Sequence, residues 1–303
     1  MKISYLTMSS ALACAATSLS AQDNAEPKQG GPPPGVASGQ GGPPPGVLSG
    51  ENVFDGDWFT IGIGAGFSSS YDGSNDYTLI PAPIVQGRLG GIGISPQPAG
   101  IALDLTPQAA RGQSDFAIGP AVRFRNDRAD NIEDEVVKLA GELDSAFEVG
   151  FAASYSIPGV FTRMDSLSLD LGARWDVAGA HDGMVIEPRI AWSRPIGRGT
   201  FQSISVNAEI VDDSFADYYY SVSPAQSAAS GLPEFSADGG LNSLGVTAFT
   251  AFDLDGNALN GGFSIVSISG YSRLIGDSAD TPYTALRGDP NQFFIAIGVG
   301  YTF

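Results

Sequence analysis

The feature that most constrains this chain is an alternation of apolar residues with small or polar ones, which recurs from Trp58 to the last residue. In "WFTIGIGAGF", Phe59, Ile61 and Ile63 fall on one face of an extended chain, while Thr60 and three glycines fall on the other. A period of two residues is typical of a β-strand whose faces meet different surroundings. Gly 40 and Pro 20 in 303 residues also suit strands and turns better than long helices. The pattern predicts an all-β fold.

Five further segments alternate in the same way, and their charged side chains all fall on the small and polar face. The segments are 116–125, 147–155, 167–176, 184–193 and 203–210. The charged residues of that face are Arg123, Arg125, Glu148, Asp170, Arg174, Asp176, Glu187, Arg189 and Glu209. We expect these side chains to line one interior, or lumen. The arginines and carboxylates would largely pair, so a narrow or plugged pore is expected rather than a wide one.

Two architectures produce this alternation. A soluble sandwich or lipocalin-like barrel turns its apolar face inward, whereas a membrane barrel turns it toward lipid. Segments of about 10 to 14 residues suit strands that cross a bilayer at a tilt, and aromatic residues bracket several of the apolar stripes. Short connections (158–163, 195–199, 253–257) alternate with long ones (126–143, 212–240, 274–290). These features favour an antiparallel transmembrane β-barrel in the outer membrane of a Gram-negative bacterium.

The strand number follows from working back along the chain. We expect strands at 58–68, 77–86, 89–95, 99–106, 115–125, 144–157, 163–177, 183–194, 199–211, 241–254, 259–273 and 291–303. If both ends of the barrel lie in the periplasm, the number must be even. The prediction is therefore about twelve strands, with ten as the alternative if two early segments merge.

The closing stretch "NQFFIAIGVGYTF" carries an apolar stripe to its final residue. Chain ends usually fray in water, but a closed barrel must pair its last strand with its first. We expect Tyr301 and Phe303 to face lipid at the periplasmic interface. Outer-membrane lipid is therefore an expected partner of the barrel. Together they would act as a C-terminal signal for assembly into the membrane.

The residues before Trp58 have a different composition. Residues 1–21 read as a secretory signal peptide, with one Lys, an apolar stretch and small residues before cleavage after Ser20 or Ala21. Processing at Cys14 as a lipoprotein is the alternative. Residues 29–50 duplicate "QGGPPPGVASG" as "QGGPPPGVLSG". Because Pro and Gly favour extended, loosely ordered chain, we expect 22–57 to be a disordered periplasmic arm and 58–303 to be the barrel.

The sequence gives little sign of a catalytic or metal-binding site. A formal net charge of -18 argues against a nucleic-acid partner. The only histidine, His181, lies beside Asp182, and with Asp212 and Asp213 it could form a protease-like site; a hairpin tip at "HDG" is the simpler interpretation. "DRADNIEDE" (127–135) could bind Ca²⁺ weakly, but it lacks regular ligand spacing. We predict no catalytic, cofactor-binding or metal-binding residues and no enzyme activity.

Four stretches together resemble the MipA/OmpV (MltA-interacting protein) family of outer-membrane proteins. They are "SYDGSNDYTLIPAPIV" (70–85), "FADYYYSVSP" (215–224), "YSRLIGDSADTPY" (271–283) and the closing "NQFFIAIGVGYTF". The resemblance implies a β-barrel. It also implies a scaffold role in peptidoglycan (murein) remodelling, with a lytic transglycosylase and a penicillin-binding protein as partners. A narrow porin-like channel for small solutes is the alternative function.

Overall fold

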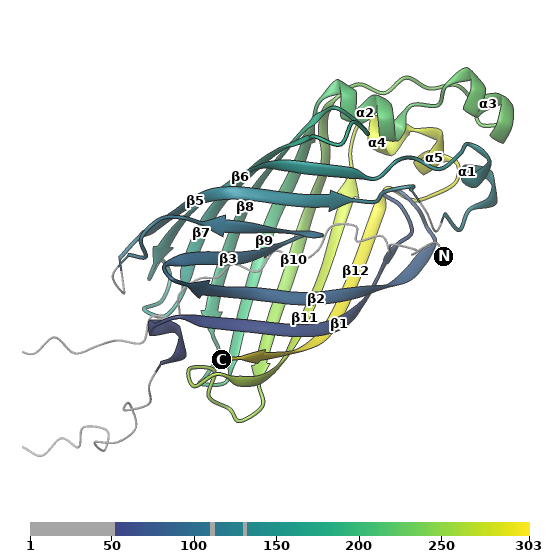
Figure 1. Ribbon diagram of the computed structural model, residues 1–303. Helices are drawn as coiled ribbons and strands as arrows, with labels where there is room; N and C mark the ends of the chain where they lie inside the picture. Colours follow the sequence, from purple (N-terminus) through teal and green to yellow (C-terminus); the bar gives the residue numbers. More distant parts are fainter. Residues whose placement is uncertain (1–51, 110–112, 130–131) are drawn as a thin grey trace, which may run out of the picture.

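Within residues 52–109, 113–129 and 132–303, which the computed structural model describes, twelve antiparallel strands close into one barrel (Figure 1). They are β1 (Trp58–Ser69), β2 (Tyr77–Leu89), β3 (Ile92–Gln97), β4 (Gly100–Asp104), β5 (Asp115–Arg125), β6 (Ala146–Pro158), β7 (Ser166–Asp176), β8 (Met184–Pro195), β9 (Thr200–Val211), β10 (Gly240–Asp253), β11 (Gly262–Leu274) and β12 (Asn291–Thr302). The predicted count of twelve is confirmed. The alternative of ten is wrong, because the early segments stay separate as β1 to β4.

The outer wall of the barrel is apolar. Ile61 and Ile63 are 52% and 74% exposed, whereas Thr60 on the opposite face of β1 is 3% exposed. The soluble alternative requires the reverse, since an apolar stripe would have to be buried in a core. The apolar stripes therefore face lipid, and the small and polar residues face the lumen.

The barrel closes where β1 pairs with β12, and glycines allow the close approach of the two strands. Gly62 lies opposite Gly300, and Gly64 lies opposite Gly298. A side-chain carbon added at Gly64 would lie 2.4 Å from the Ile297 carbonyl oxygen, which is closer than atoms can pack. The alternating glycines of both strands thus serve the seam as well as the lumen face.

The two ends of the barrel differ. The turn end, which carries the start of β1 and the end of β12, has the short connections 159–165 and 196–199. The other end carries the long segments and their helices (Figure 1). These are α1 (Glu135–Leu139), α2 (Asp213–Tyr220), α3 (Pro224–Ser230), α4 (Asp277–Asp280) and α5 (Pro282–Ala285). The segments 126–145, 212–239 and 275–290 are called the cap below. The long connections were predicted, but their helices were not. None of the helices in the described part of the chain combines the length and apolar character needed to span a membrane.

Ordered structure begins before the predicted barrel boundary at Trp58. Val53–Asp55 form a short 3-10 helix, and the side-chain oxygen of Asn52 accepts a hydrogen bond from the Phe54 amide at 3.1 Å. The Val53 amide donates to the Leu259 carbonyl at 2.9 Å, which ties this helix to the β10–β11 turn. The last residues assigned to the arm are therefore part of the barrel rim. The predicted signal peptide and residues 22–51 of the arm lie outside the described residues.

Candidate functional site

Six charged side chains from five consecutive strands meet inside the barrel near the cap end. This charged partition consists of Arg123 and Arg125 (β5), Glu148 (β6), Arg174 (β7), Glu187 (β8) and Glu209 (β9). All six were predicted from the sequence to line the lumen. The alternation places each of them on the inward face of its strand.

Some ion pairs of the partition join neighbouring strands, and others cross between strands that are not neighbours in the sheet. Arg125 donates from Nε to Glu148 Oε1 at 2.7 Å and from Nη2 to Glu209 Oε2 at 3.0 Å. Arg123 Nη1 lies 2.7 Å from Glu187 Oε1, and Arg174 also pairs with Glu187. Since β5 and β9 lie four strands apart in the barrel, the Arg125–Glu209 bond spans interior space and does not run along the wall.

The charged side chains of the partition need partners of opposite charge because most of them are buried. Arg123 is 2% exposed, Arg174 1% and Glu148 0%. Removing such charges from water costs several kcal/mol for each ion, and only close opposite charges with good hydrogen bonds offset that cost. Glu148 contacts all three arginines of the partition. It is the residue on which the charge balance of the partition depends most.

The other predicted lumen charges have separate roles. Arg189 Nη2 pairs with Asp170 Oδ2 at 2.9 Å, and the Ser154 hydroxyl donates to Asp170 Oδ1 at 2.6 Å. Asp176 serves the β7–β8 turn, where its carboxylate accepts the backbone N–H groups of residues 178, 180, 181 and 182. The structure thus brings six of the nine predicted charges into one network, two into a second pair, and one into a turn.

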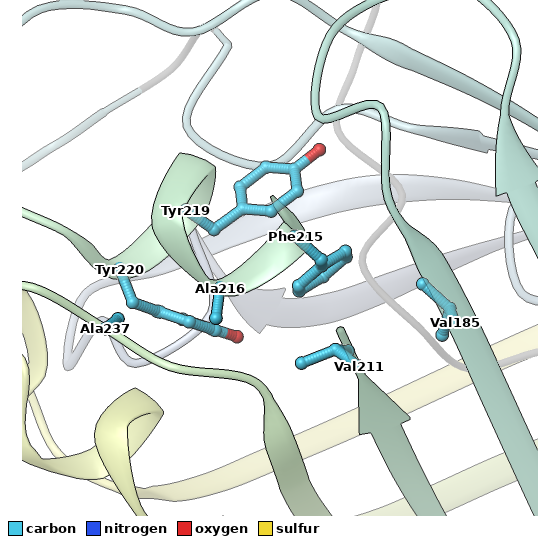
Figure 2. Close-up of a cluster of buried hydrophobic side chains, with 7 residues drawn as sticks. All are labelled: Val185, Val211, Phe215, Ala216, Tyr219, Tyr220 and Ala237. Atoms are coloured by element: carbon cyan, nitrogen blue, oxygen red, sulfur yellow. The ribbon is translucent and has the colours of Figure 1, made fainter. Parts of the chain in front are cut away.

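Helix α2 covers the partition from the cap side. Figure 2 shows its side chains Phe215, Ala216 and Tyr219 packed in the cluster that also contains Val185 and Val211 at the cap ends of β8 and β9. The Arg125 guanidinium lies 4.7 Å from the centre of the Phe215 ring, a cation–π contact in a desolvated setting. The partition is therefore held from below by carboxylates and from above by aromatic rings.

His181 belongs to this site, which the sequence did not predict. Its ring is 5.0 Å from Phe215 and 5.7 Å from Tyr219, and its Nε2 is 3.5 Å from Glu148 Oε1. The simpler interpretation of "HDG" places a turn at these residues, and the turn is present between β7 and β8. The side chain nevertheless folds inward and is 3% exposed. A single histidine in a polar loop carries no signal of such burial.

Arg128 joins the three long segments into one cap. It is 1% exposed, donates from Nη1 to the Tyr219 carbonyl at 2.7 Å, and its guanidinium lies 3.7 Å from the Tyr283 ring centre. Its backbone has φ 51°, a left-handed conformation that costs free energy for a residue other than Gly. Thr281 Oγ1 adds a hydrogen bond of 2.6 Å to the Tyr220 carbonyl. The cap is therefore a packed layer, anchored on strands by its own side chains.

Two acidic residues of the cap side lie close together near the partition. The Asp72 amide donates to Asp127 Oδ1 at 2.8 Å. Burial and the neighbouring Asp72 carboxylate raise the pKa of Asp127 to about 7. Burial also raises the pKa of Asp72, against the opposing effect of Arg125. Asp127 therefore changes its charge near neutral pH.

Below the partition the lumen holds a cavity of about 390 Å³. Its lining runs from Trp58, Gly261 and Thr302 at the turn end to Glu187 and Glu209 of the partition. The cavity is thus continuous with the rim at the turn end. Charged side chains of the partition bound it toward the cap on the side of β5 to β9, and its lining reaches Asn242 and Gln292 on the other side.

The family model described as "MltA-interacting protein MipA" matches residues 61–303. The chain belongs to this family. That span covers β2 to β12 and β1 from residue 61 on, and membership agrees with the resemblance seen in the sequence. This MipA family member is an outer-membrane β-barrel protein of a Gram-negative bacterium, in keeping with its lipid-facing apolar wall.

Several solved structures match the chain at low sequence identity and low TM-score. OprD from Pseudomonas aeruginosa has 12% sequence identity and a TM-score of 0.27, with 85% of this chain and 98% of that chain covered. The channel DcaP of Acinetobacter baumannii has 10% identity and a TM-score of 0.26, with 84% and 100% covered. A Pseudomonas aeruginosa FadL homologue has 11% identity and a TM-score of 0.30, with 84% and 93% covered. No curated protein matches the chain.

The carboxylates considered for a protease-like site are engaged in local structure. Asp212 caps α2 by accepting the Phe215 amide at 3.1 Å, and it also accepts the Met184 amide at 2.8 Å. Asp213 accepts the Gly239 amide at 2.8 Å. The carboxylate next to the His181 ring is Glu148 of the partition, not Asp182. Among the described residues, no group of three or more His, Cys, Asp or Glu is arranged to hold a metal ion.

Proposed function

We propose that this MipA family member is a non-enzymatic scaffold of the outer membrane that supports murein remodelling. The observation that carries the proposal is the charged partition with its cap. Buried side chains cross the lumen on the side of β5 to β9, and α2 packs over them, so a solute would have to pass ion pairs and aromatic rings there. A barrel built in this way is better suited to binding other proteins at its surface than to conducting solutes through its lumen.

The family description supplies the partner class. A protein named for interaction with MltA suggests a lytic transglycosylase as a partner, and a penicillin-binding protein is the second partner implied by the resemblance. In this proposal the cap faces outward and the short turns face the periplasm, together with the Pro/Gly-rich arm. The β6–β7 turn is a suitable contact point, since Phe161 is 72% and Met164 63% exposed there.

Photo-crosslinking from defined positions tests this proposal. A photoreactive amino acid replaces Phe161 or Met164 in the full chain expressed in cells, and the matched control replaces Leu286, which is 61% exposed in the cap. We expect murein enzymes to be captured from the turn positions and not from the cap position. Failure to capture any murein synthase or lytic enzyme from either turn position would overturn the scaffold role.

A narrow channel is the second candidate, and the cavity favours it. The cavity of about 390 Å³ already occupies the lumen from the turn end to the partition. Only the partition and the cap would have to move for solutes to pass. Planar-bilayer recording of the purified barrel distinguishes the two functions: stepwise conductance supports a channel, whereas a silent folded barrel supports the scaffold.

A further inference from the structure

We propose that the lumen cavity is a binding site for a neutral oligosaccharide that enters from the turn end. The inference goes beyond the scaffold role and does not depend on it, because it uses only the walls of the lumen. Four observations carry it: hydroxyl and amide groups in the lining, apolar and aromatic side chains among them, charges that already have partners, and two buried acceptors without a donor.

The cavity is lined by hydroxyl and amide groups. Strand β6 contributes Ser154 and Ser156 to its lining, and strand β9 contributes Ser205 and Asn207. A hydroxyl group both donates and accepts hydrogen bonds, and an amide offers two donors and an acceptor. Such a lining matches a ligand whose own surface carries many hydroxyl groups, since each can find a partner of either kind.

Apolar and aromatic side chains line the cavity among these polar groups. Ile84 of β2, Val266 of β11 and Phe294 of β12 belong to the lining, beside Ser264 and Thr302. Phe249 and Phe201 add two aromatic rings, with their ring centres 6.3 Å apart. Aromatic rings present an electron-rich face to C–H groups. A sugar ring has one face of C–H groups and a rim of hydroxyls, so it suits a lining that offers both kinds of contact.

The charged side chains of the cavity already have partners within the protein. Arg88 Nη2 lies 2.6 Å from Asp104 Oδ2, and Arg189 Nη2 lies 2.9 Å from Asp170 Oδ2. At the rim, Asp253 accepts turn amides. A ligand with net charge would have to break such a pair or remain without a counter-ion in the lumen. The cavity therefore selects a neutral ligand.

Two buried acceptors in the lining lack a donor. Gln292 Oε1 and Asn242 Oδ1 have no hydrogen-bond partner, whereas the amide nitrogens of both side chains are used, by the Ser74 carbonyl and by Glu209 Oε1. Gln292 is 7% and Asn242 3% exposed, and both line the cavity. An unsatisfied buried acceptor destabilises a folded protein, because the group has lost its hydrogen bonds to water. Donors on a ligand that fills the cavity as far as the partition would satisfy these oxygens.

The size and shape of the cavity agree with binding rather than passage. Its volume of about 390 Å³ falls within the common range for small-ligand pockets. On the side of β5 to β9 the ion pairs of the partition bound it toward the cap. A ligand that enters from the turn end therefore meets these ion pairs before the cap.

Trp58 supplies the readout, because it lines the cavity while Trp175 is 43% exposed on the outer wall. The full chain with Trp175→Phe and Trp192→Phe keeps Trp58 as its single tryptophan. It is purified in an amine-oxide detergent, since sugar-based detergents would compete for the site. Tri-N-acetylchitotriose, maltotriose and decanoate are titrated separately against Trp58 fluorescence.

We expect saturable binding of a trisaccharide and none of decanoate. Saturation by the acetylated trisaccharide points to a murein-type glycan, and saturation by maltotriose alone points to a glucan. Phe249→Ala and Asn207→Ala should each weaken binding about tenfold, which corresponds to about 1.4 kcal/mol. Phe263→Ala, on the lipid-facing wall at 56% exposure, is the matched control and should leave it unchanged.

Heat-modifiable gel migration confirms that each variant is folded. If either Phe249→Ala or Asn207→Ala fails to fold, the remaining one of these two variants serves as the test. Absence of saturation by both trisaccharides up to about 10 mM in the folded barrel would overturn the proposal. So would saturation by decanoate alone, since the site would then be an apolar one. Neither result bears on the crosslinking test of the scaffold role.

Discussion

At the scale of single residues, the balance of the partition depends on Glu148. Its carboxylate is fully buried and contacts Arg123, Arg125 and Arg174. Glu148→Gln removes the negative charge while keeping the size of the side chain, and it leaves three buried cations with less compensation. We expect a loss of about 3–5 kcal/mol in the free energy of unfolding, measured by urea unfolding in detergent micelles. The exposed cap residue Glu142 is the control, and Glu142→Gln should change stability by less than about 0.5 kcal/mol.

Asp127 should make stability depend on pH. Its pKa is about 7 in the folded protein, raised by burial and by Asp72 from an ordinary value of 3.8. Between these two pKa values the folded state keeps a proton that the unfolded state has lost. The contribution of protonated Asp127 to stability is therefore fully present below about pH 4 and is lost as the pH rises through 7. Asp127→Asn should flatten the fall of the apparent Tm between pH 5 and pH 8. An unchanged slope in that variant would contradict the assignment.

Residue patterns in the sequence predict which face a side chain takes, but not which partner it meets. The alternation identified the inward face of β5 to β9, including Arg125 and Glu209. Their pairing could not be predicted, because the two residues lie 84 positions apart and come together only through barrel closure. His181 was assigned to a turn, and nothing in its local sequence indicates that Phe215 and Tyr219 surround it.

At the scale of elements, strands were predictable and cap helices were not. The strand segments carry a strong period of two over 11 residues or more for β1, β5 and β7. Helix α2 has 8 residues and α4 has 4. Helices this short are marginal on their own and depend on tertiary contacts. The packing of α2 against the partition, and not its propensity, therefore determines its structure.

Phe215 is the anchor by which α2 holds the partition. It is 1% exposed and contacts His181, Tyr219 and the Arg125 guanidinium. Phe215→Ala should cost about 3–5 kcal/mol of local stability, so hydrogen exchange should speed up across 212–239 while the amides of β1 and β12 stay protected. Glu234→Ala, an exposed change in the same segment, should leave exchange as in the wild type. Loss of protection throughout the barrel would show that α2 is part of the barrel's cooperative unit.

At the scale of the whole molecule, the strand count and the direction of the apolar face were predicted because both depend on the regular pattern. β3 and β4 have 6 and 5 residues, so they are shorter than their predicted spans of 89–95 and 99–106. β2 correspondingly extends to Leu89. The glycine-rich stretch 90–100 weakens the pattern, because glycine adds no side chain to either face. Strand boundaries are therefore hardest to predict where glycines interrupt the alternation of side chains.

The closing contact of the barrel gives the last prediction. The Phe303 amide donates to the Phe59 carbonyl at 2.9 Å, and its ring lies 4.8 Å from the Tyr301 ring on the lipid-facing side. Deleting Phe303 removes a ladder bond at the seam and a side chain that is 64% exposed toward lipid. We expect a lower fraction of folded, heat-modifiable protein in the outer membrane after this deletion than after the lumen change Ser205→Ala.

Both the Phe303 deletion and Ser205→Ala keep the lumen charges and the cap. A difference in yield between them therefore reports on assembly and not on the stability of the partition. If the Phe303 deletion assembled as efficiently as Ser205→Ala, the seam would not need this residue, and the role of the apolar terminus as an assembly signal would be refuted. A reduced yield with a normal unfolding midpoint in the fraction that does fold would place the effect in insertion. Tyr301→Ala should act in the same direction, since Tyr301 pairs with Ile61 across the seam and packs against Phe263.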